Sequence, residues 1–167
     1  EGADVVKAGQ WARRARLALG VDFAGATIGL IGIGAIGKTV ARILSQGFGA
    51  KVIACDPYVS AEEIAARHAS KVDLDTLLAD SEIISLHCPL TAETSRMLGA
   101  EQIARMRPGV ILVNTCRGEI YKQADLIAAL ESGKVGGYAT DVVEGEPIDG
   151  NHVLLKTANV IITPHLG

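Results

Sequence analysis

A glycine-rich hexapeptide, GIGAIG, begins at Gly32 and directly follows a continuous apolar run. In a G-x-G-x-x-G pattern the first glycine permits a tight turn, and the second, Gly34, lets backbone approach a pyrophosphate. The third, Gly37, lets the following helix pack against the strand. The free N–H groups and the positive dipole end near Ala35 and Ile36 would receive the phosphates. A glycine-rich turn can also be a purely structural connection, so the pattern needs a second signal.

A carboxylate follows the next apolar run, because Asp56 lies 19 residues beyond Gly37. At the end of a second strand, this carboxylate would accept hydrogen bonds from the adenosine ribose of a dinucleotide. Its negative charge would also repel the 2′-phosphate that distinguishes NADP from NAD. Together the two signals predict a dinucleotide site and favour NAD as the cofactor.

Three further polar residues, Arg117, Glu146 and His165, follow other predicted strands. Open α/β sheets place their ligand crevice at such strand ends. A guanidinium can hold a carboxylate or carbonyl oxygen, and an imidazolium can protonate that oxygen as a hydride reaches the carbon. A carboxylate beside the imidazole would favour its charged form. The set suits carbonyl reduction, although a single histidine near a terminus or arginine in a loop is more often a solvated surface residue.

The elements that must position these residues alternate along the chain. Apolar runs predict strands at residues 26–31, 51–54, 82–86, 110–113, 137–140 and 160–162, with a short strand around Val72. Amphipathic stretches predict helices through 39–46, after an N-cap at Ser60, and at 74–79, 100–106 and 123–132. We therefore expect an α/β fold: a Rossmann-type, doubly wound parallel sheet of about six to seven strands with helices on both faces.

Composition excludes several other classes of protein. The 167 residues are 49% apolar and 21% charged, which excludes a disordered chain. The charged residues are scattered and sum to −3, so we expect no nucleic-acid and no membrane partner. Cys55, Cys88 and Cys116 lack the spacing of a disulfide framework or a zinc site. We expect no metal and a cytoplasmic location, because no membrane span or signal peptide is found either.

Six motifs, in order, resemble one enzyme family. They are GIGAIG, Asp56-Pro57-Tyr58, His87-Cys88-Pro89-Leu90-Thr91, Asn114-Thr115-Cys116-Arg117-Gly118, Asp141-Val142 with Glu146-Pro147, and Thr163-Pro164-His165. They are similar to the coenzyme-binding domain of the D-isomer-specific 2-hydroxyacid dehydrogenase family, from about Phe23 onward. The Cys-Pro pair and the final His-Leu-Gly most resemble the phosphoglycerate dehydrogenase branch. Val143 departs from the pattern, because the family often has an aromatic residue there.

The resemblance implies a catalytic role for three residues. Arg117 would bind the substrate, a small 2-hydroxy or 2-keto acid. His165 would be the acid/base and Glu146 its partner. The reaction implied is hydride transfer between the nicotinamide and that acid, catalysed by an NAD-dependent oxidoreductase.

The resemblance also implies which residues contact the cofactor. Asp141, Thr115 and Cys116 would lie against the nicotinamide carboxamide, whereas Cys88 and Pro89 would line the adenine side. The full set expected to contact NAD is Gly32, Gly34, Ala35, Ile36, Gly37, Asp56, Pro57, His87, Cys88, Pro89, Thr115, Cys116, Arg117, Asp141, His165 and Gly167.

In this family a smaller substrate domain is built from segments before and after the coenzyme domain. Residues 1–167 are therefore expected to be an excised NAD-binding domain that lacks its flanking substrate domain. Two alternatives stay open. One is an NAD-sensing interaction module like the related transcriptional corepressors, and the other is a relative of formate or phosphonate dehydrogenases.

An amphipathic helix is predicted over residues 4–19. Its apolar side, broader than one contact needs, consists of Val5, Val6, Ala8, Trp11, Ala12, Ala15 and Leu19. In related dehydrogenases the coenzyme domains form the two-fold interface, so we expect a homodimer through this domain. The alternative is that Trp11 packs on its own sheet.

Overall fold

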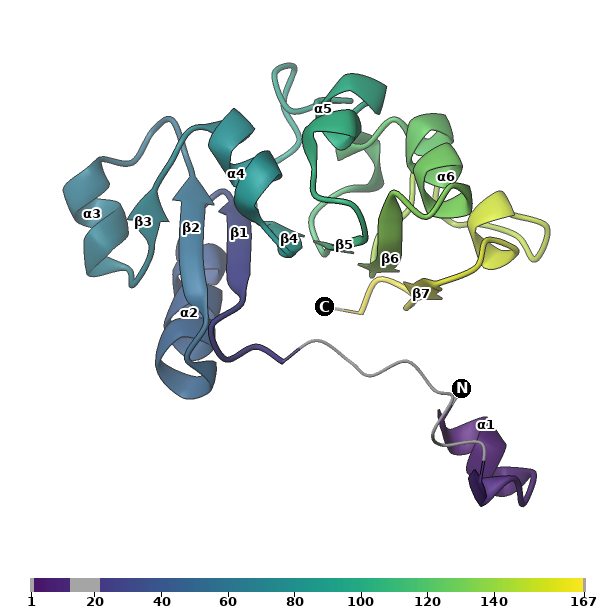
Figure 1. Cartoon of the computed structure of the whole chain (residues 1–167). Helices are drawn as coiled ribbons and strands as arrows, with labels where there is room; N and C mark the ends of the chain where they lie inside the picture. Colours follow the sequence, from purple (N-terminus) through teal and green to yellow (C-terminus); the bar gives the residue numbers. More distant parts are fainter. Residues whose placement is uncertain (1, 13–21, 167) are drawn as a thin grey trace.

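The computed structural model describes residues 2–12 and 22–166, and its centre is one parallel sheet (Figure 1). The strands are β1 Thr27–Ile31, β2 Lys51–Cys55, β3 Ser70–Lys71, β4 Ile83–Leu86, β5 Val110–Asn114, β6 Val135–Thr140 and β7 Val160–Ile162. Their order is β3-β2-β1-β4-β5-β6-β7, and every neighbouring pair is parallel. The predicted parallel sheet is therefore confirmed, with seven strands.

The strand order reverses beside β1. The chain runs from β1 outward to β2 and β3, and then returns to β4 on the other side of β1. Ile31 at the end of β1 pairs with Cys55 on one side and with Leu86 on the other, so the three strands end level. In open α/β sheets the ligand crevice lies outside the carboxyl ends of the strands at such a reversal. The residues that follow these three strands therefore lie where the ligand crevice is expected.

Helices cover both faces of the sheet. They are α2 Ala35–Arg42, α3 Ala61–Ala66, α4 Leu74–Asp80, α5 Ala100–Arg105 and α6 Gln123–Glu131. One buried apolar cluster joins α4, α5 and α6 to the sheet and includes Ile53, whereas a second joins α2 and α3 and includes Val52. Successive strand residues point to opposite faces, so the two clusters lie on the two sides of the sheet. The doubly wound arrangement is thereby confirmed.

The start of α3 follows a local sequence signal. Oγ of Ser60 accepts a 3.2 Å hydrogen bond from the Glu63 N–H, and the Glu63 carboxylate accepts a 3.1 Å bond from the Ser60 N–H. This reciprocal capping box confirms the predicted N-cap. The helix ends just before Arg67, whose side chain reaches the glycine-rich loop.

The N-terminal helix is shorter than predicted. α1 covers only Gly2–Lys7, and the chain then turns at Gly9 with φ +67, a conformation that glycine adopts without strain. Trp11 follows in a short 3₁₀ turn. The prediction of one continuous helix is therefore wrong for the described residues up to 12. The rest of the predicted range, 13–19, lies outside the described residues.

Other differences are confined to short segments. A π-helical turn, η2 Ile43–Gly47, continues α2, and two 3₁₀ turns, η3 Gly118–Ile120 and η4 Val153–Leu155, lie in predicted loops. The short strand expected around Val72 is β3, which ends one residue earlier. Within residues 2–12 and 22–166, no helix has the length and apolar character needed to cross a membrane.

Candidate coenzyme and catalytic site

The glycine-rich loop joins β1 to α2, and two of its glycines are required by close backbone contacts. Gly32 has φ +90, and a Cβ built on it would lie 2.6 Å from the carbonyl oxygen of His87. A Cβ on Gly37 would lie 2.6 Å from the carbonyl oxygen of Gly32. Real Cβ atoms do not approach backbone this closely. The tight turn and the close helix–strand packing predicted for these two glycines are therefore both present.

Gly34 differs from these two glycines, because its missing side chain would meet only open space. A Cβ built there has nothing within 4 Å, and its φ is an ordinary −66°. Gly34 is the N-cap of α2, and among the described residues no side chain caps this helix. The first N–H groups of α2 thus keep their hydrogen-bonding capacity beside the open space at Gly34. This arrangement fits a pyrophosphate.

Asp56 holds the same loop. Its Oδ2 accepts a 3.0 Å hydrogen bond from the Ile33 N–H, and its Oδ1 accepts a 3.0 Å bond from the Tyr58 N–H. The Arg67 guanidinium donates a 2.7 Å bond to the Ile33 carbonyl oxygen. Each carboxylate oxygen has two lone pairs, so each retains one that could accept a ribose hydroxyl.

The far side of the crevice, after β4 and β5, is lined by neutral groups. Leu86 pairs with Asn114, so Cys88 and Cys116 each lie two residues beyond a matched pair. Burial raises the pKa of the Cys88 thiol to about 11 and also raises the pKa of Cys116, whose thiol donates to the Leu86 carbonyl oxygen at 2.9 Å. Both thiols are therefore uncharged at neutral pH.

His87 directly precedes Cys88 in the chain and is also neutral. Burial lowers its pKa, and its Nε2 lies 3.0 Å from Oγ of Ser85. Its buried Nδ1 has no hydrogen-bond partner among the described residues. An uncharged wall with one unused polar atom suits the uncharged adenine base of a dinucleotide.

The turn that carries Arg117 is held by a fully buried asparagine. Asn114 Oδ1 accepts a 2.9 Å hydrogen bond from the Cys116 N–H, and its Nδ2 donates a 2.9 Å bond to the Arg117 carbonyl oxygen. The next residue, Gly118, packs so closely on the Val143–Glu144 peptide that a Cβ would overlap it. The exposed Arg117 guanidinium donates to the Cys116 carbonyl oxygen at 2.6 Å. Among the described residues it makes no hydrogen bond to Glu146 or His165.

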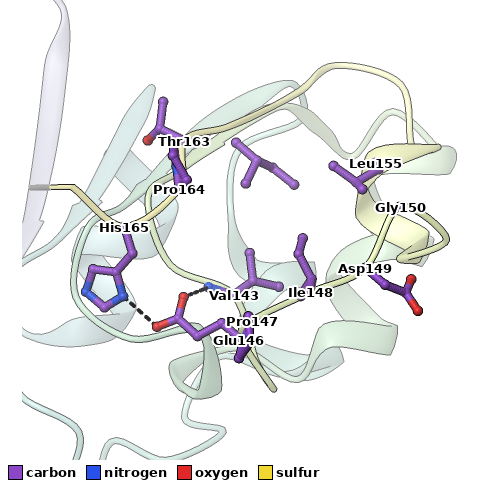
Figure 2. Close-up of a pocket in the computed structure, with 11 residues that line it drawn as sticks. Val143, Glu146, Pro147, Ile148, Asp149, Gly150, Leu155, Thr163, Pro164 and His165 are labelled. Carbon is purple, nitrogen blue, oxygen red and sulfur yellow. Dashed lines mark hydrogen bonds and ion pairs between the residues drawn. The ribbon is translucent and has the colours of Figure 1, made fainter.

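Glu146 and His165 are in direct contact, as Figure 2 shows. Nδ1 of His165 lies 2.5 Å from Oε1 of Glu146, and the other carboxylate oxygen accepts a 3.4 Å bond from the Val143 N–H. Both side chains are partly exposed, with His165 40% and Glu146 36% accessible. The pairing predicted from sequence is therefore present.

The loops after β6 and β7 are joined at a second point. Thr163 Oγ1 donates a 2.6 Å hydrogen bond to the buried carboxylate of Asp141. A cavity of about 540 Å³ lies between these loops, and Val143, Ile148 and Leu155 point into it, whereas the His165 ring points away (Figure 2). The cavity thus lies beside the histidine–glutamate pair.

The remaining predicted residues are distributed around the crevice. Pro57, Pro89 and Thr115 are exposed after β2, β4 and β5, as are Ala35 and Ile36 at the start of α2. Gly167 lies outside the described residues. Sequence reasoning assigned no role to Arg67, Asn114, Gly118 or Thr163, which hold the loops. Asn114, Gly118 and Thr163 had a signal, because they lie in the motifs that contain Arg117 and His165, whereas Arg67 lies in none of the six motifs.

Comparison with known proteins agrees with this geometry. The whole chain, residues 1–167, matches the family described as D-isomer specific 2-hydroxyacid dehydrogenase, NAD binding domain. It is 42% identical over 161 residues to D-3-phosphoglycerate dehydrogenase of Archaeoglobus fulgidus, covering 96% of this chain and 30% of that protein. It is 42% identical over 146 residues to hydroxypyruvate reductase of Blautia hydrogenotrophica, covering 87% of this chain and 45% of that protein.

A solved structure is similar over nearly the entire chain. The crystal structure of a glyoxylate reductase from Paecilomyes thermophila superposes with a TM-score of 0.86 at 36% identity, covering 99% of this chain and 49% of that one. The chain thus spans less than half the length of each of these three proteins. The resemblance seen in the six motifs, and NAD as the cofactor, are confirmed. The chain belongs to the D-isomer-specific 2-hydroxyacid dehydrogenase family and corresponds to its NAD-binding domain.

Proposed function

We propose that this domain supplies the cofactor site and the Arg117, Glu146 and His165 side chains for oxidoreduction of a D-2-hydroxy acid. When bound, NAD accepts or donates the hydride. The observation that carries the proposal is the 2.5 Å contact between His165 Nδ1 and Glu146. A carboxylate that accepts from Nδ1–H leaves Nε2 able to exchange a proton with the substrate hydroxyl or carbonyl oxygen.

Arg117 is the proposed substrate-binding residue. Its planar guanidinium can bind a carboxylate through two parallel hydrogen bonds, which suits the acid group shared by this substrate class. The Asn114 bonds on the adjoining turn support a fixed backbone position for Arg117. Binding the acid group there would orient carbon 2 for the proton exchange at His165.

The nicotinamide and adenine contacts are also proposals. We assign Asp141, Thr115 and Cys116 to the nicotinamide end and Cys88 with Pro89 to the adenine end. The uncharged Cys88 thiol supports the adenine assignment, because a neutral surface accommodates that base without desolvating an ion. Asp56 is the proposed ribose ligand and the determinant of NAD over NADP.

The substrate within the class is proposed to be phosphoglycerate-like. The Cys88-Pro89 pair and the Archaeoglobus fulgidus relative named D-3-phosphoglycerate dehydrogenase support this choice. Relatives named hydroxypyruvate reductase and glyoxylate reductase are as similar, so a direct comparison of these substrates is required.

We further propose that the domain acts as a homodimer and needs a second domain for turnover. Two exposed apolar side chains near the N-terminus, Val6 at 52% and Trp11 at 61%, support the dimer. The coverage of less than half of each relative supports the need for a second domain, because hydride transfer requires a closed, water-excluding cleft. A cytoplasmic location is supported by three free thiols.

The test is a chimera in which residues 1–167 replace the matching segment of the Archaeoglobus fulgidus enzyme. Its steady-state turnover of 2-keto acids is measured with NADH. His165→Gln and Glu146→Gln should reduce kcat, the first by a factor of about 10²–10⁴, with NADH affinity unchanged. His68→Asn, at an exposed histidine with positive φ, is the matched control and should leave kcat unchanged. Undiminished kcat in His165→Gln would contradict the proposal. The isolated chain should bind NADH without meaningful turnover.

A further inference from the structure

A hydrogen bond joins the two sides of the crevice near the proposed ribose position. The hydroxyl of Tyr58, two residues after Asp56, donates a 2.9 Å hydrogen bond to Oε2 of Glu93. Tyr58 follows β2, whereas Glu93 lies in the loop that follows β4. Because β2 and β4 are the two neighbours of β1, this bond connects segments on either side of the strand that leads into the glycine-rich loop.

The loop that carries Glu93 is held by its own threonines. Thr94 Oγ1 donates a 2.6 Å hydrogen bond to the Pro89 carbonyl oxygen and accepts a 2.8 Å bond from the Thr91 N–H. The Glu93 N–H donates to Thr91 Oγ1 at 3.3 Å. On the opposite side, the Tyr58 N–H is bound to Asp56. The two ends of the bridge are thus each tied to a fixed segment, which places the Glu93 carboxylate before any cofactor arrives.

The Glu93 carboxylate therefore acts directly on the Tyr58 hydroxyl, and the Asp56 carboxylate acts on it more weakly. The hydrogen bond and charge of Glu93 raise the pKa of Tyr58, and the charge of Asp56 adds to this effect. Two of the cations on this side are hydrogen-bonded to backbone carbonyl oxygens. Arg67 donates to the Ile33 carbonyl oxygen and lies 3.9 Å from Glu63, and the Lys71 ammonium donates to the Val59 carbonyl oxygen at 2.5 Å.

We propose that Glu93, held in place by Tyr58, is a second determinant of the preference for NAD over NADP. Its carboxylate adds to the field of Asp56 at the ribose, where the 2′-phosphate of NADP would bring up to two negative charges. The inference rests on the proposed function only through the position of the ribose at Asp56. Glu93 is a selectivity residue that repels the wrong cofactor, whereas Tyr58 is a positioning residue that acts through Glu93.

The experiment measures the dissociation constants of NADH and NADPH by fluorescence titration of the full chain. Glu93→Gln should strengthen NADPH binding by about threefold to tenfold, the size expected for one nearby exposed charge, with NADH binding within about twofold of wild type. The gain should shrink as salt is raised, because the Debye length falls below about 10 Å above 0.1 M. Glu131→Gln, at the end of α6, removes the same charge far from the crevice and is the matched control.

Tyr58→Phe separates position from charge. It keeps the ring and the Glu93 charge but removes the hydrogen bond, so it should give a smaller gain in NADPH binding than Glu93→Gln. In the Glu93→Gln background, Tyr58→Phe should then cause no further change in the ratio of the NADPH and NADH dissociation constants. If Tyr58 had a purely structural role, Tyr58→Phe would instead weaken the binding of NADH and NADPH equally, both in the wild-type chain and in Glu93→Gln.

The outcomes distinguish this inference from the proposed ribose site. If Glu93→Gln has the same NADPH and NADH dissociation constants as Glu131→Gln, while Asp56→Asn brings the two constants closer together, Glu93 has no selectivity role. The ribose assignment then stands. If neither Asp56→Asn nor Glu93→Gln changes the ratio, the position assigned to the ribose is itself wrong. A selective gain of NADPH affinity in Glu93→Gln, absent from Glu131→Gln, supports the inference.

Discussion

The N–H of Ile33 donates a 3.0 Å hydrogen bond to Oδ2 of Asp56, so the proposed ribose ligand also holds the glycine-rich loop. Ile33 is fully buried, and its carbonyl oxygen is bound by Arg67. Both polar backbone groups of this residue are thus satisfied by side chains from outside the loop. Removing the Asp56 side chain would therefore change the loop as well as the charge, and the two effects need separate variants.

Asp56→Asn and Asp56→Ala should have different consequences. The asparagine retains an oxygen for the Ile33 N–H but loses the charge, so NADPH affinity should approach that of NADH with little change in stability. The alanine also leaves a buried N–H unpaired, which costs about 1–3 kcal/mol of unfolding free energy and should weaken NADH binding. Isothermal titration with both cofactors, together with urea unfolding, measures these effects. Equal affinity of the wild-type chain for NADH and NADPH would contradict the role of Asp56.

Arg67 should support the loop from the opposite side. In Arg67→Met the Ile33 carbonyl oxygen loses its charged donor, so we expect a loss of about 1–2 kcal/mol of unfolding free energy and weaker NADH binding. Arg67→Lys can still donate one hydrogen bond and should recover part of both. Arg107→Met, which removes an exposed 3.8 Å ion pair with Glu82, is the control and should change stability by less than about 1 kcal/mol. Identical urea midpoints for the two methionine variants would rule out this role.

The unfolding free energy should decrease as pH is lowered below the ordinary histidine pKa, because of His87. Burial lowers the pKa of this ring from 6.5 in the folded state, so the unfolded chain binds more protons between the two pKa values. The neutral ring therefore gives its full contribution above about pH 6.5, and that contribution decreases as pH falls toward the folded-state pKa. In His87→Gln the unfolding free energy should depend less on pH in this window, as measured by urea titrations at a series of pH values. The same pH slope in wild type and His87→Gln would disprove the assignment.

Association should depend on the N-terminal segment. Light scattering at tens of micromolar should give the mass of a dimer for the wild-type chain and a shift toward the monomer in Trp11→Ala. Phe48→Ala removes another exposed aromatic side chain, 52% accessible, and should leave the dimer intact. A wild-type monomer at this concentration would argue against the dimer.

The sequence could predict the sheet because buried parallel strands require continuous apolar runs. The run ending at Ile31 became β1 with its start shifted by one residue, and the Ser60–Glu63 spacing predicted a capping box that is present. The helix over residues 4–19 failed because its apolar spacing continues past Gly9, where the backbone turns. Apolar periodicity carries no information on a single glycine with positive φ.

The sequence could predict those site residues whose role follows from the chemistry of their side chains. It could not predict the residues whose role follows from a tertiary contact. The motifs containing Glu146 and His165 indicated a pair, and the two side chains do meet. The link from Arg67 to Ile33, across 34 residues, has no local signal, because only the packing of α3 brings them together. The support from Asn114 is likewise visible only in the hydrogen bonds of its turn.

The cofactor site is tested most directly by the NADH dissociation constant of Gly34→Ala, compared with Gly37→Ala. A Cβ at Gly34 meets open space, so unfolding free energy should stay within about 1 kcal/mol of wild type. The same Cβ enters the space proposed for the pyrophosphate, so NADH should bind at least about tenfold more weakly, or ~1.4 kcal/mol. In Gly37→Ala the Cβ meets backbone at 2.6 Å, and stability itself should fall by about 1–3 kcal/mol. Wild-type NADH affinity in a stably folded Gly34→Ala variant would contradict the account, because it would show that the pyrophosphate does not lie against this loop.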